Sequence, residues 1–219
     1  MKFQERETMK KNKSGMDIFR TPSEKVGRSL AFAVFFLLPV MGFSANLKGK
    51  WGLEKSEITY TVTHPLHVVH GKSLSARGEG VCYEDGNCRF LVAVPVKTFD
   101  SGDNNRDLHM QEVTRAGLNP LIKVNVEMAQ KGELKASQQL TADAEIEFAG
   151  KKAKYPGLKL DVVELKPDEV HITGTIPLTL KAFEIQPPSL LTLPVNNEVP
   201  VKLDMWWKRS NGKAVPKKK

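Results

Sequence analysis

Hydrophobic and polar residues alternate along most of the chain after residue 55. A period of two places apolar side chains on one face of an extended strand and polar side chains on the other. The alternation therefore predicts an all-β domain of about eight strands. Six segments show the pattern clearly and two show it more weakly; the clear ones are 58–63, 90–96, 122–128, 140–148, 170–180 and 199–207, and the weaker ones are 67–82 and 158–165.

The expected strands are separated by short polar turns such as Asp85-Gly86, Gly150-Lys151 and Pro167-Asp168. Connections of this length join neighbouring antiparallel strands, so the order along the chain predicts a meander. An open meander leaves two strand edges unpaired, and closure into a barrel removes both edges. We therefore expect a closed antiparallel eight-stranded barrel.

One segment, residues 103–116, does not alternate. Its sequence, DNNRDLHMQEVTRA, predicts a short helix that is capped near Asp103 and stopped at Gly117. Leu108 and Val113 are expected to face inward. We expect this helix to pack near the barrel.

The first 44 residues have the composition of an export signal. Residues 29–41 form an apolar run, basic residues precede it, and Gly42 and Ser44 supply the small side chains that signal peptidase requires. The run is about 13 residues long, whereas a membrane span needs roughly 20. We expect residues 1–44 to be a signal peptide cleaved after Ser44, and the protein to be periplasmic or secreted. An uncleaved anchor is the alternative.

Charge is concentrated at the ends of the chain. The whole sequence carries a net charge of +8, but residues 45–207 hold 19 Lys and Arg against 21 Asp and Glu. The predicted domain is therefore near neutral, which argues against a nucleic-acid partner, because such binding needs basic groups clustered on one folded face. Residues 208–219 contain six basic residues and no acidic one. We expect a disordered tail there, which either touches an anionic membrane surface or aids solubility.

Cys82 and Cys88 are the only cysteines in the sequence. If residues 84–86 form a three-residue hairpin loop with Gly86 in the left-handed conformation, the two cysteines fall opposite each other. This predicts a cross-strand disulfide, in keeping with an oxidising compartment. The alternative is a pair of free thiols, since the spacing fits neither a redox CxxC pair nor a zinc site.

Periodicity alone does not decide which face of the strands looks inward. A soluble barrel with an apolar lumen and an outer-membrane barrel with an apolar exterior both alternate. Aromatic residues make up 7% of the chain, few for two interfacial girdles, and the chain ends in lysines rather than in a strand. We therefore favour a soluble barrel.

A motif links the strand at 90–96 to the predicted helix. Residues 94–110, VPVKTFDSGDNNRDLHM, combine a strand, a Ser-Gly turn and an Arg-Asp-x-His run. This arrangement strongly resembles the YceI-like polyisoprenoid-binding family, and the likeness extends over residues 51–207 through segments 57–64, 117–122 and 173–191. The motif residues are Ser101, Gly102, Arg106, Asp107 and His109.

The resemblance implies a lipocalin-like barrel enclosing a long isoprenoid chain, in an exported protein that binds or carries its ligand. The ligand would be an isoprenoid lipid or an isoprenoid quinone, and no other cofactor is implied. An eight-stranded barrel either holds one ligand or is filled by its own side chains, so a structural or stress-related envelope protein with a filled barrel is the alternative. The residues expected to line the lumen are Tyr60, Val62, Phe90, Val92, Val94, Val124, Val126, Ile146, Phe148, Ile176, Leu178, Leu203 and Met205.

His64, His67 and His70 suggest a zinc site at first sight. On one extended strand, however, His67 would face away from the other two, and Pro65 disturbs the register. We therefore expect no metal, and we expect His64 to be hydrogen-bonded inside the barrel.

Arg106, Asp107 and His109 admit a catalytic or a structural interpretation. The structural one is favoured, because an acidic residue satisfies free N–H groups at a helix start and a neighbouring Arg locks the loop. The sequence also contains no nucleophile elbow and no phosphate loop. We therefore do not expect this protein to be an enzyme. An enzyme that acted on a prenyl lipid would use His64 or Arg106. A homodimer formed through paired strand edges is left open.

Overall fold

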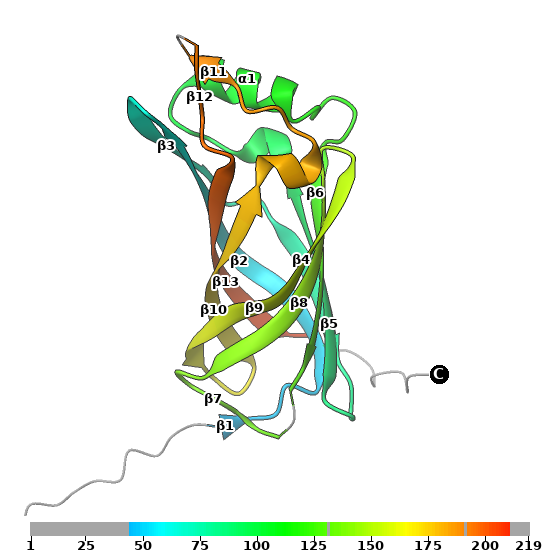
Figure 1. Cartoon of the computed structure of the whole chain (residues 1–219). Helices are drawn as coiled ribbons and strands as arrows, with labels where there is room; N and C mark the ends of the chain where they lie inside the picture. The colour runs from blue at the N-terminus through cyan, green and yellow to red at the C-terminus, as the bar shows by residue number, and fades with distance from the viewer. Residues whose placement is uncertain (1–43, 131, 191, 211–219) are drawn as a thin grey trace, which may run out of the picture. The chain divides into compact units, whose positions relative to one another are not determined.

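The alternating segments form one antiparallel sheet that closes on itself in the computed structural model (Figure 1). The structure describes residues 44–130, 132–190 and 192–210. The predicted signal peptide lies outside this range apart from Ser44. The strands of the sheet are β2 (Gly49–His64), β3 (His67–Ser73), β4 (Arg77–Cys82), β5 (Asn87–Pro95), β6 (Leu121–Ala129), β8 (Gln139–Phe148), β9 (Lys151–Leu165), β10 (Glu169–Thr179) and β13 (Glu198–Arg209).

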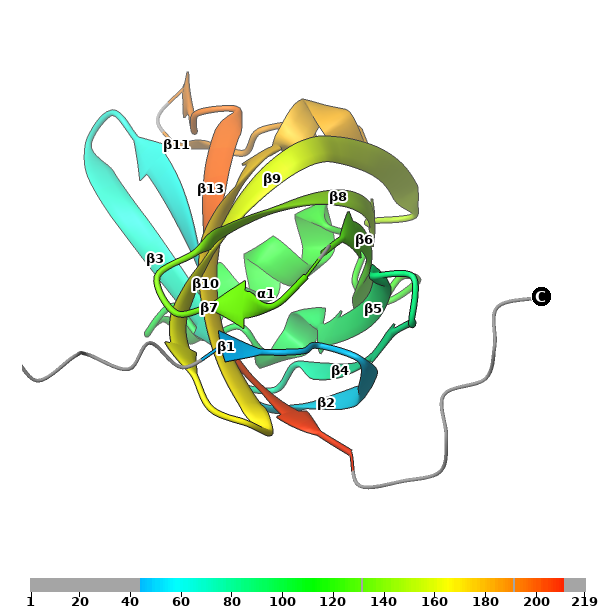
Figure 2. The same ribbon diagram turned by 90° about the horizontal axis from the view of Figure 1, so that it is seen from below.

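Strand β13 closes the barrel, because it pairs with β10 on one side and with β2 on the other. The long strand β2 pairs with β4 through its first residues and with β3 through its second half. β3 and β4 are therefore two parts of the strand expected at 67–82, interrupted at 74–76. Counted together they give the predicted eight-stranded closed barrel. Figure 2, seen from below, shows the strands arranged in a ring with α1 across the far end.

The predicted turns lie where the strands reverse. At Ala149 and Gly150 the backbone adopts φ values of 52° and 79°, and the flanking residues Phe148 and Lys151 pair directly. Two successive left-handed residues give the two-residue turn whose twist matches that of the flanking strands.

The apolar faces of the strands point into the barrel, and the charged faces point outward. On the outer wall, Lys123 pairs with Glu147 across β6 and β8 at 3.1 Å, and Arg89 pairs with Glu127 across β5 and β6 at 3.1 Å. Both pairs are well exposed. This is the reverse of the apolar exterior of an outer-membrane barrel.

The expected helix is α1 (Asn104–Val113), and the Asp103 side chain caps it by accepting a hydrogen bond from the Arg106 N–H at 3.0 Å. It ends before the predicted stop at Gly117, because Arg115 adopts the left-handed conformation, with φ 56°, that terminates helices. Among the described residues, no helix is long and apolar enough to cross a bilayer. The minor elements are the 3₁₀ helices η1 (Val96–Thr98) and η2 (Leu180–Phe183) and the short strands β1 (Ser44–Ala45), β7 (Leu134–Lys135), β11 (Ser189–Leu190) and β12 (Leu193–Pro194).

Two predictions about single residues need correction. Leu108 does not face inward; it is 59% exposed, because α1 turns the opposite side, with Met110 and Val113, toward the barrel interior. The basic tail does not begin at residue 208, because Lys208 and Arg209 belong to β13. Arg209 donates hydrogen bonds to the Asn46 carbonyl and to Asp168, which hold it in the fold.

Candidate functional site

A cavity of about 760 Å³ occupies the inside of the barrel. Inward-facing side chains of β2, β5, β6, β8, β10 and β13 form its wall, because successive residues of a strand alternate between lumen and exterior. Pockets that hold small molecules usually measure roughly 300–1,000 Å³. The barrel is therefore hollow enough for a guest molecule, and the filled-barrel alternative does not describe it.

The lumen-facing residues expected from the alternation all lie in the wall of this cavity. Their contact with a ligand stays a prediction. They are Tyr60, Val62, Phe90, Val92, Val94, Val124, Val126, Ile146, Phe148, Ile176, Leu178, Leu203 and Met205.

Sequence reasoning left out other wall residues for two reasons. Ile58, Ile172 and Val201 lie on the same alternating faces, so the pattern contained the signal that places them in the wall. Phe99 and Met110 come from the segment after η1 and from α1, which have no period of two. Only the fold brings those two side chains to the lumen.

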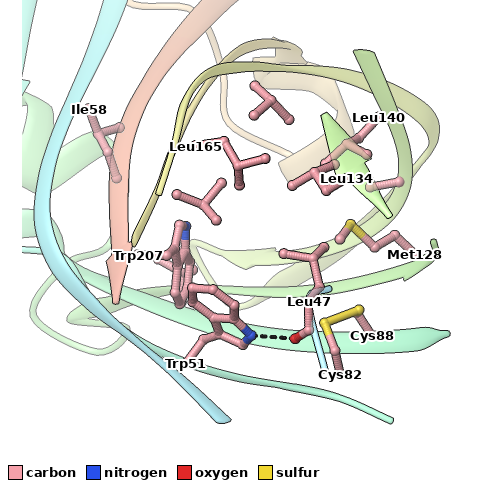
Figure 3. Packing of buried hydrophobic residues seen from close by; sticks show 14 of the residues in the cluster. Leu47, Trp51, Ile58, Cys82, Cys88, Met128, Leu134, Leu140, Leu165 and Trp207 are labelled. Atoms are coloured by element: carbon pink, nitrogen blue, oxygen red, sulfur yellow. Dashed lines mark hydrogen bonds between the residues drawn. A yellow bond between two sulfur atoms is a disulfide. The ribbon is translucent and has the colours of Figure 1, made fainter. Parts of the chain in front are cut away.

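One end of the cavity is closed by a plug of buried side chains, shown in Figure 3. Trp51 is 2% exposed, and its indole N–H donates to the Leu47 carbonyl at 2.7 Å. That bond holds the segment before β2 over the end of the barrel, where β1 pairs with β7. The Trp207 ring meets the Phe90 ring edge to face at 4.9 Å. These buried side chains therefore form the floor of the cavity.

The disulfide Cys82–Cys88 is confirmed and lies beside this plug (Figure 3). The two residues pair across β4 and β5, as the three-residue loop requires, and Gly86 is left-handed with φ 83°. Both half-cystines are buried. The bond therefore fastens the hairpin whose strands form the closed end.

The other end of the cavity is its mouth. The exposed residues of the wall all lie there: on α1 and its cap, at the start of β3 and on β11. His109 of α1 is one of them, and its Nδ1 lies 3.6 Å from Glu112. The exposed wall residues are His67, Asp103, Asn105, His109 and Ser189.

The Ser-Gly and Arg-Asp-x-His motif forms a hydrogen-bonded cluster that fixes the loop before α1. The Arg106 guanidinium donates through Nε to the Ser101 hydroxyl at 2.8 Å and through Nη2 to the Ser101 carbonyl at 2.7 Å. The Ser101 hydroxyl donates to Asp107 at 2.5 Å, and the Ser101 N–H also points to that carboxylate. Each of these side chains thus holds another in place, which supports the structural interpretation of the motif.

Tyr60 lies in the cavity wall near this cluster. Burial raises the pKa of the Tyr60 hydroxyl, and the negative charge of Asp107 raises it further, while Arg106 and the Ser101 hydrogen bond oppose the shift. The phenol is therefore neutral at physiological pH and adds no charge to the lumen.

The three histidines lie on two strands rather than on one. Pro65 and Leu66 form a tight turn, so His64 at the end of β2 faces His67 at the start of β3, with ring centroids 5.0 Å apart. The expectation that His67 points away from His64 is therefore wrong. His70 bonds the Thr61 hydroxyl instead, at 3.0 Å.

His64 is buried and hydrogen-bonded, as expected. Its Nδ1 accepts from the Leu66 N–H at 3.2 Å, so the neutral ring carries its proton on Nε2, which bonds the Leu193 carbonyl at 3.0 Å. Within the part of the chain that the structure describes, no three His, Cys, Asp or Glu side chains gather closely enough to hold a metal ion.

No family model and no curated protein matches the sequence. Among solved structures, the chain is similar to a polyisoprenoid-binding domain from Saccharophagus degradans implicated in plant cell wall breakdown. The TM-score is 0.60 at 12% identity, over 73% of this chain and 98% of that one. It is also similar to BcnA of Burkholderia cenocepacia, with a TM-score of 0.56 at 15% identity, over 69% of this chain and 95% of that one.

At these identities the likeness shows the fold, and it confirms the predicted lipocalin-like barrel. One of the two neighbours is a polyisoprenoid-binding domain, the class of protein that the motif at residues 94–110 indicated.

Proposed function

We propose that this protein binds a long apolar lipid of the isoprenoid class inside the barrel and carries it without changing it chemically. The observation that carries the proposal is the cavity of about 760 Å³, walled by apolar strand faces, closed at the Trp51 end and open at the α1 end. The shared fold with a polyisoprenoid-binding domain supports the same ligand class.

The energetics suit a hydrocarbon chain. Each methylene group removed from water contributes about 0.8 kcal/mol, so a ligand of many carbons binds tightly without directed contacts. A polar head group would remain at the mouth, where the exposed wall residues of α1 lie. The cavity therefore favours a ligand that is apolar over most of its length.

A carrier is favoured over an enzyme by the bonding of His64 and Arg106, the two residues that an enzyme would use. Arg106 and Asp107 are both engaged with Ser101, and His64 uses both ring nitrogens in hydrogen bonds to the backbone. An acid–base catalyst needs a group that reaches the substrate with a free donor or acceptor.

Export to the cell envelope belongs to the same proposal. The buried disulfide supports it, because such bonds persist in oxidising compartments. The mass of the mature protein purified from its host tests this directly: cleavage after Ser44 leaves a chain that begins at Ala45, and a full-length chain in the cytoplasm would contradict it.

The experiment that tests ligand binding compares the same substitution inside and outside the barrel. Ala144 of β8 lines the cavity and is 4% exposed, whereas Ala93 of β5 lies between the lumen-facing residues Val92 and Val94 and points outward. Ala144→Phe should fill part of the lumen and reduce the amount of co-purified prenyl lipid, measured by mass spectrometry of an organic extract. Ala93→Phe should leave that amount unchanged.

Two results would overturn the proposal. One is wild-type protein that is consistently free of lipid and takes up no added geranylgeraniol or longer prenol. The other is equal lipid content in the two variants, which would place the lipid outside the barrel.

A further inference from the structure

Two segments of the chain lack charged residues and meet at the mouth of the cavity. Residues 58–71 and 185–197 contain no Asp, Glu, Lys or Arg, although such residues make up 26% of the sequence. The first segment forms most of the β2–β3 hairpin, and the second contains β11 and β12. Both lie at the end of the barrel where α1 is found (Figure 1).

Hydrogen bonds join these segments into one surface. His64 Nε2 bonds the Leu193 carbonyl at 3.0 Å, and the Asn196 N–H donates to the Thr63 carbonyl at 2.8 Å. The β2–β3 hairpin and the β11–β12 hairpin are therefore held side by side, and Figures 1 and 2 show them adjacent from both directions.

Large apolar side chains are exposed on this surface. Leu66 is 62% exposed, Val68 is 53% exposed and Leu193 is 41% exposed. The intervening residues His67 and Val69 line the cavity, so strand β3 turns one face to the lumen and the other to solvent. We call Leu66, Val68 and Leu193 the rim patch.

We infer that the rim patch docks the mouth of the barrel onto a lipid bilayer, so that a prenyl lipid passes between membrane and lumen without crossing water. The inference rests on the proposed function, because only an apolar ligand needs such a route. Apolar side chains without neighbouring charges insert at the boundary between head groups and acyl chains, and long-chain lipid ligands reside in that bilayer.

The charge pattern around the mouth favours a bilayer as the occupant. The other side of the mouth, α1 and its cap, carries Asp103, Arg106, Asp107 and Glu112. The side of the mouth without charges therefore suits the acyl layer, and the charged α1 side, which also exposes Leu108, suits the head-group layer that a tilted barrel would meet. Most soluble proteins leave large apolar side chains exposed singly, whereas grouped ones beside a binding site usually mark an interaction surface.

The test changes the rim patch without changing the cavity. The double variant Leu66→Asp/Val68→Asp places two charges on the patch, and Leu91→Asp/Val163→Asp places the same two charges on the outer wall. The control residues are also about half exposed, Leu91 at 49% and Val163 at 51%, against 62% and 53% for Leu66 and Val68. The single variants Leu66→Asp and Leu193→Asp examine the two hairpins separately. Melting temperatures establish that each protein is folded.

Two measurements are made on each protein. The first is co-flotation with vesicles of phosphatidylethanolamine and phosphatidylglycerol, at low and high salt. The second is affinity for geranylgeraniol added from ethanol, which requires no membrane. We expect the rim variant to lose vesicle binding by about tenfold or more, because transfer of a charged group into the acyl region is unfavourable, and to keep its affinity for geranylgeraniol. The wall variant should behave as wild type in both.

The outcomes separate this inference from the proposed function. Equal vesicle binding by the rim and wall variants would overturn the inference while leaving ligand binding intact. Failure of every protein to bind geranylgeraniol would overturn the proposed function. Vesicle binding that disappears at high salt would assign the contact to the basic residues at the C-terminus, because apolar insertion is not screened by salt. A wild-type dimer that the rim variant dissociates would assign the patch to a second copy of the chain.

Discussion

The two ends of the barrel are built from different kinds of contact. The closed end buries Trp51, Leu134 and the Cys82–Cys88 disulfide almost completely. The open end is bordered by α1, which has no fully buried side chain and is held by its capping Asp103 and the Ser101 cluster. Packed apolar area therefore closes one end, whereas α1 at the other end is positioned by hydrogen bonds above a second buried cluster that contains Val96 and Phe183.

The two ends should therefore contribute differently to the stability of the domain and to the entry of a ligand. Segments with few buried apolar contacts open locally at low free-energy cost, whereas packed strands open only when the whole domain unfolds. Changes at the closed end should therefore mainly alter the free energy of unfolding, and changes in α1 and the loop before it should mainly alter the rate at which a ligand enters and leaves.

The largest expected effect is that of Trp51→Ala at the closed end. The substitution removes a side chain that is 2% exposed together with its bond to the Leu47 carbonyl. Loss of a buried aromatic side chain should lower the free energy of unfolding by about 3–5 kcal/mol, measured by urea denaturation. Leu108→Ala at the open end is the control and should change it by less than about 0.5 kcal/mol. Similar losses in the two variants would show that the two ends are equally important for stability.

A smaller effect is expected from the disulfide. Replacing both Cys82 and Cys88 by Ala opens a loop with a sequence separation of 6 residues. A loop this short should contribute about 2 kcal/mol through the entropy of the unfolded chain. Denaturation of the double variant measures this loss, and addition of dithiothreitol to the wild type should reproduce it. Unchanged ligand affinity would agree with a role confined to the closed end, and lost affinity would contradict it.

The closed barrel was predictable because period two marks the strands and sorts their side chains onto two faces, and the low aromatic content and lysine-rich end then favoured an apolar lumen. Val124 and Val126 of β6, for example, lie in the cavity wall as their alternation with charged residues predicts. The hairpin turns were also predictable, since Gly86 and Gly150 adopt the left-handed conformation that hairpins require.

The open end was less predictable, because tertiary contacts decide it. Leu108 was expected to face inward because it is apolar, but the orientation of α1 on the barrel leaves its side chain exposed to solvent. The β2–β3 hairpin was not predicted because the short turn Pro65-Leu66 is followed by the weakly alternating segment 67–82. The β11–β12 hairpin is held by long-range contacts such as the bond from His64 to the Leu193 carbonyl. A local sequence pattern does not predict contacts of this kind.

At the open end, substitution of Arg106 should have a moderate effect. Its guanidinium makes two hydrogen bonds to Ser101, and a lysine cannot repeat that fork. Both Arg106→Ala and Arg106→Lys should lower the free energy of unfolding by about 1–2 kcal/mol and speed the release of bound prenol. Hydrogen exchange at the amides of residues 101–103 should rise in step. Unaltered exchange in Arg106→Ala would mean that the cluster does not position α1, and an enzyme would instead lose turnover with no change in stability.

Tyr60→Phe should have the smallest effect on the free energy of unfolding at neutral pH. Its effect should appear only at high pH, where the buried phenol of the wild type ionises. Burial raises the pKa of the Tyr60 hydroxyl in the folded protein above its ordinary value of about 10. The folded state thus favours the neutral phenol, so the wild type keeps its full stability below pH 10 and loses part of it as the pH rises through the folded-state pKa. Phenylalanine cannot ionise, and the variant should lose less stability over that interval. Parallel stability curves for the two proteins above pH 10, measured by urea denaturation, would show that Tyr60 is not held away from water by the lumen.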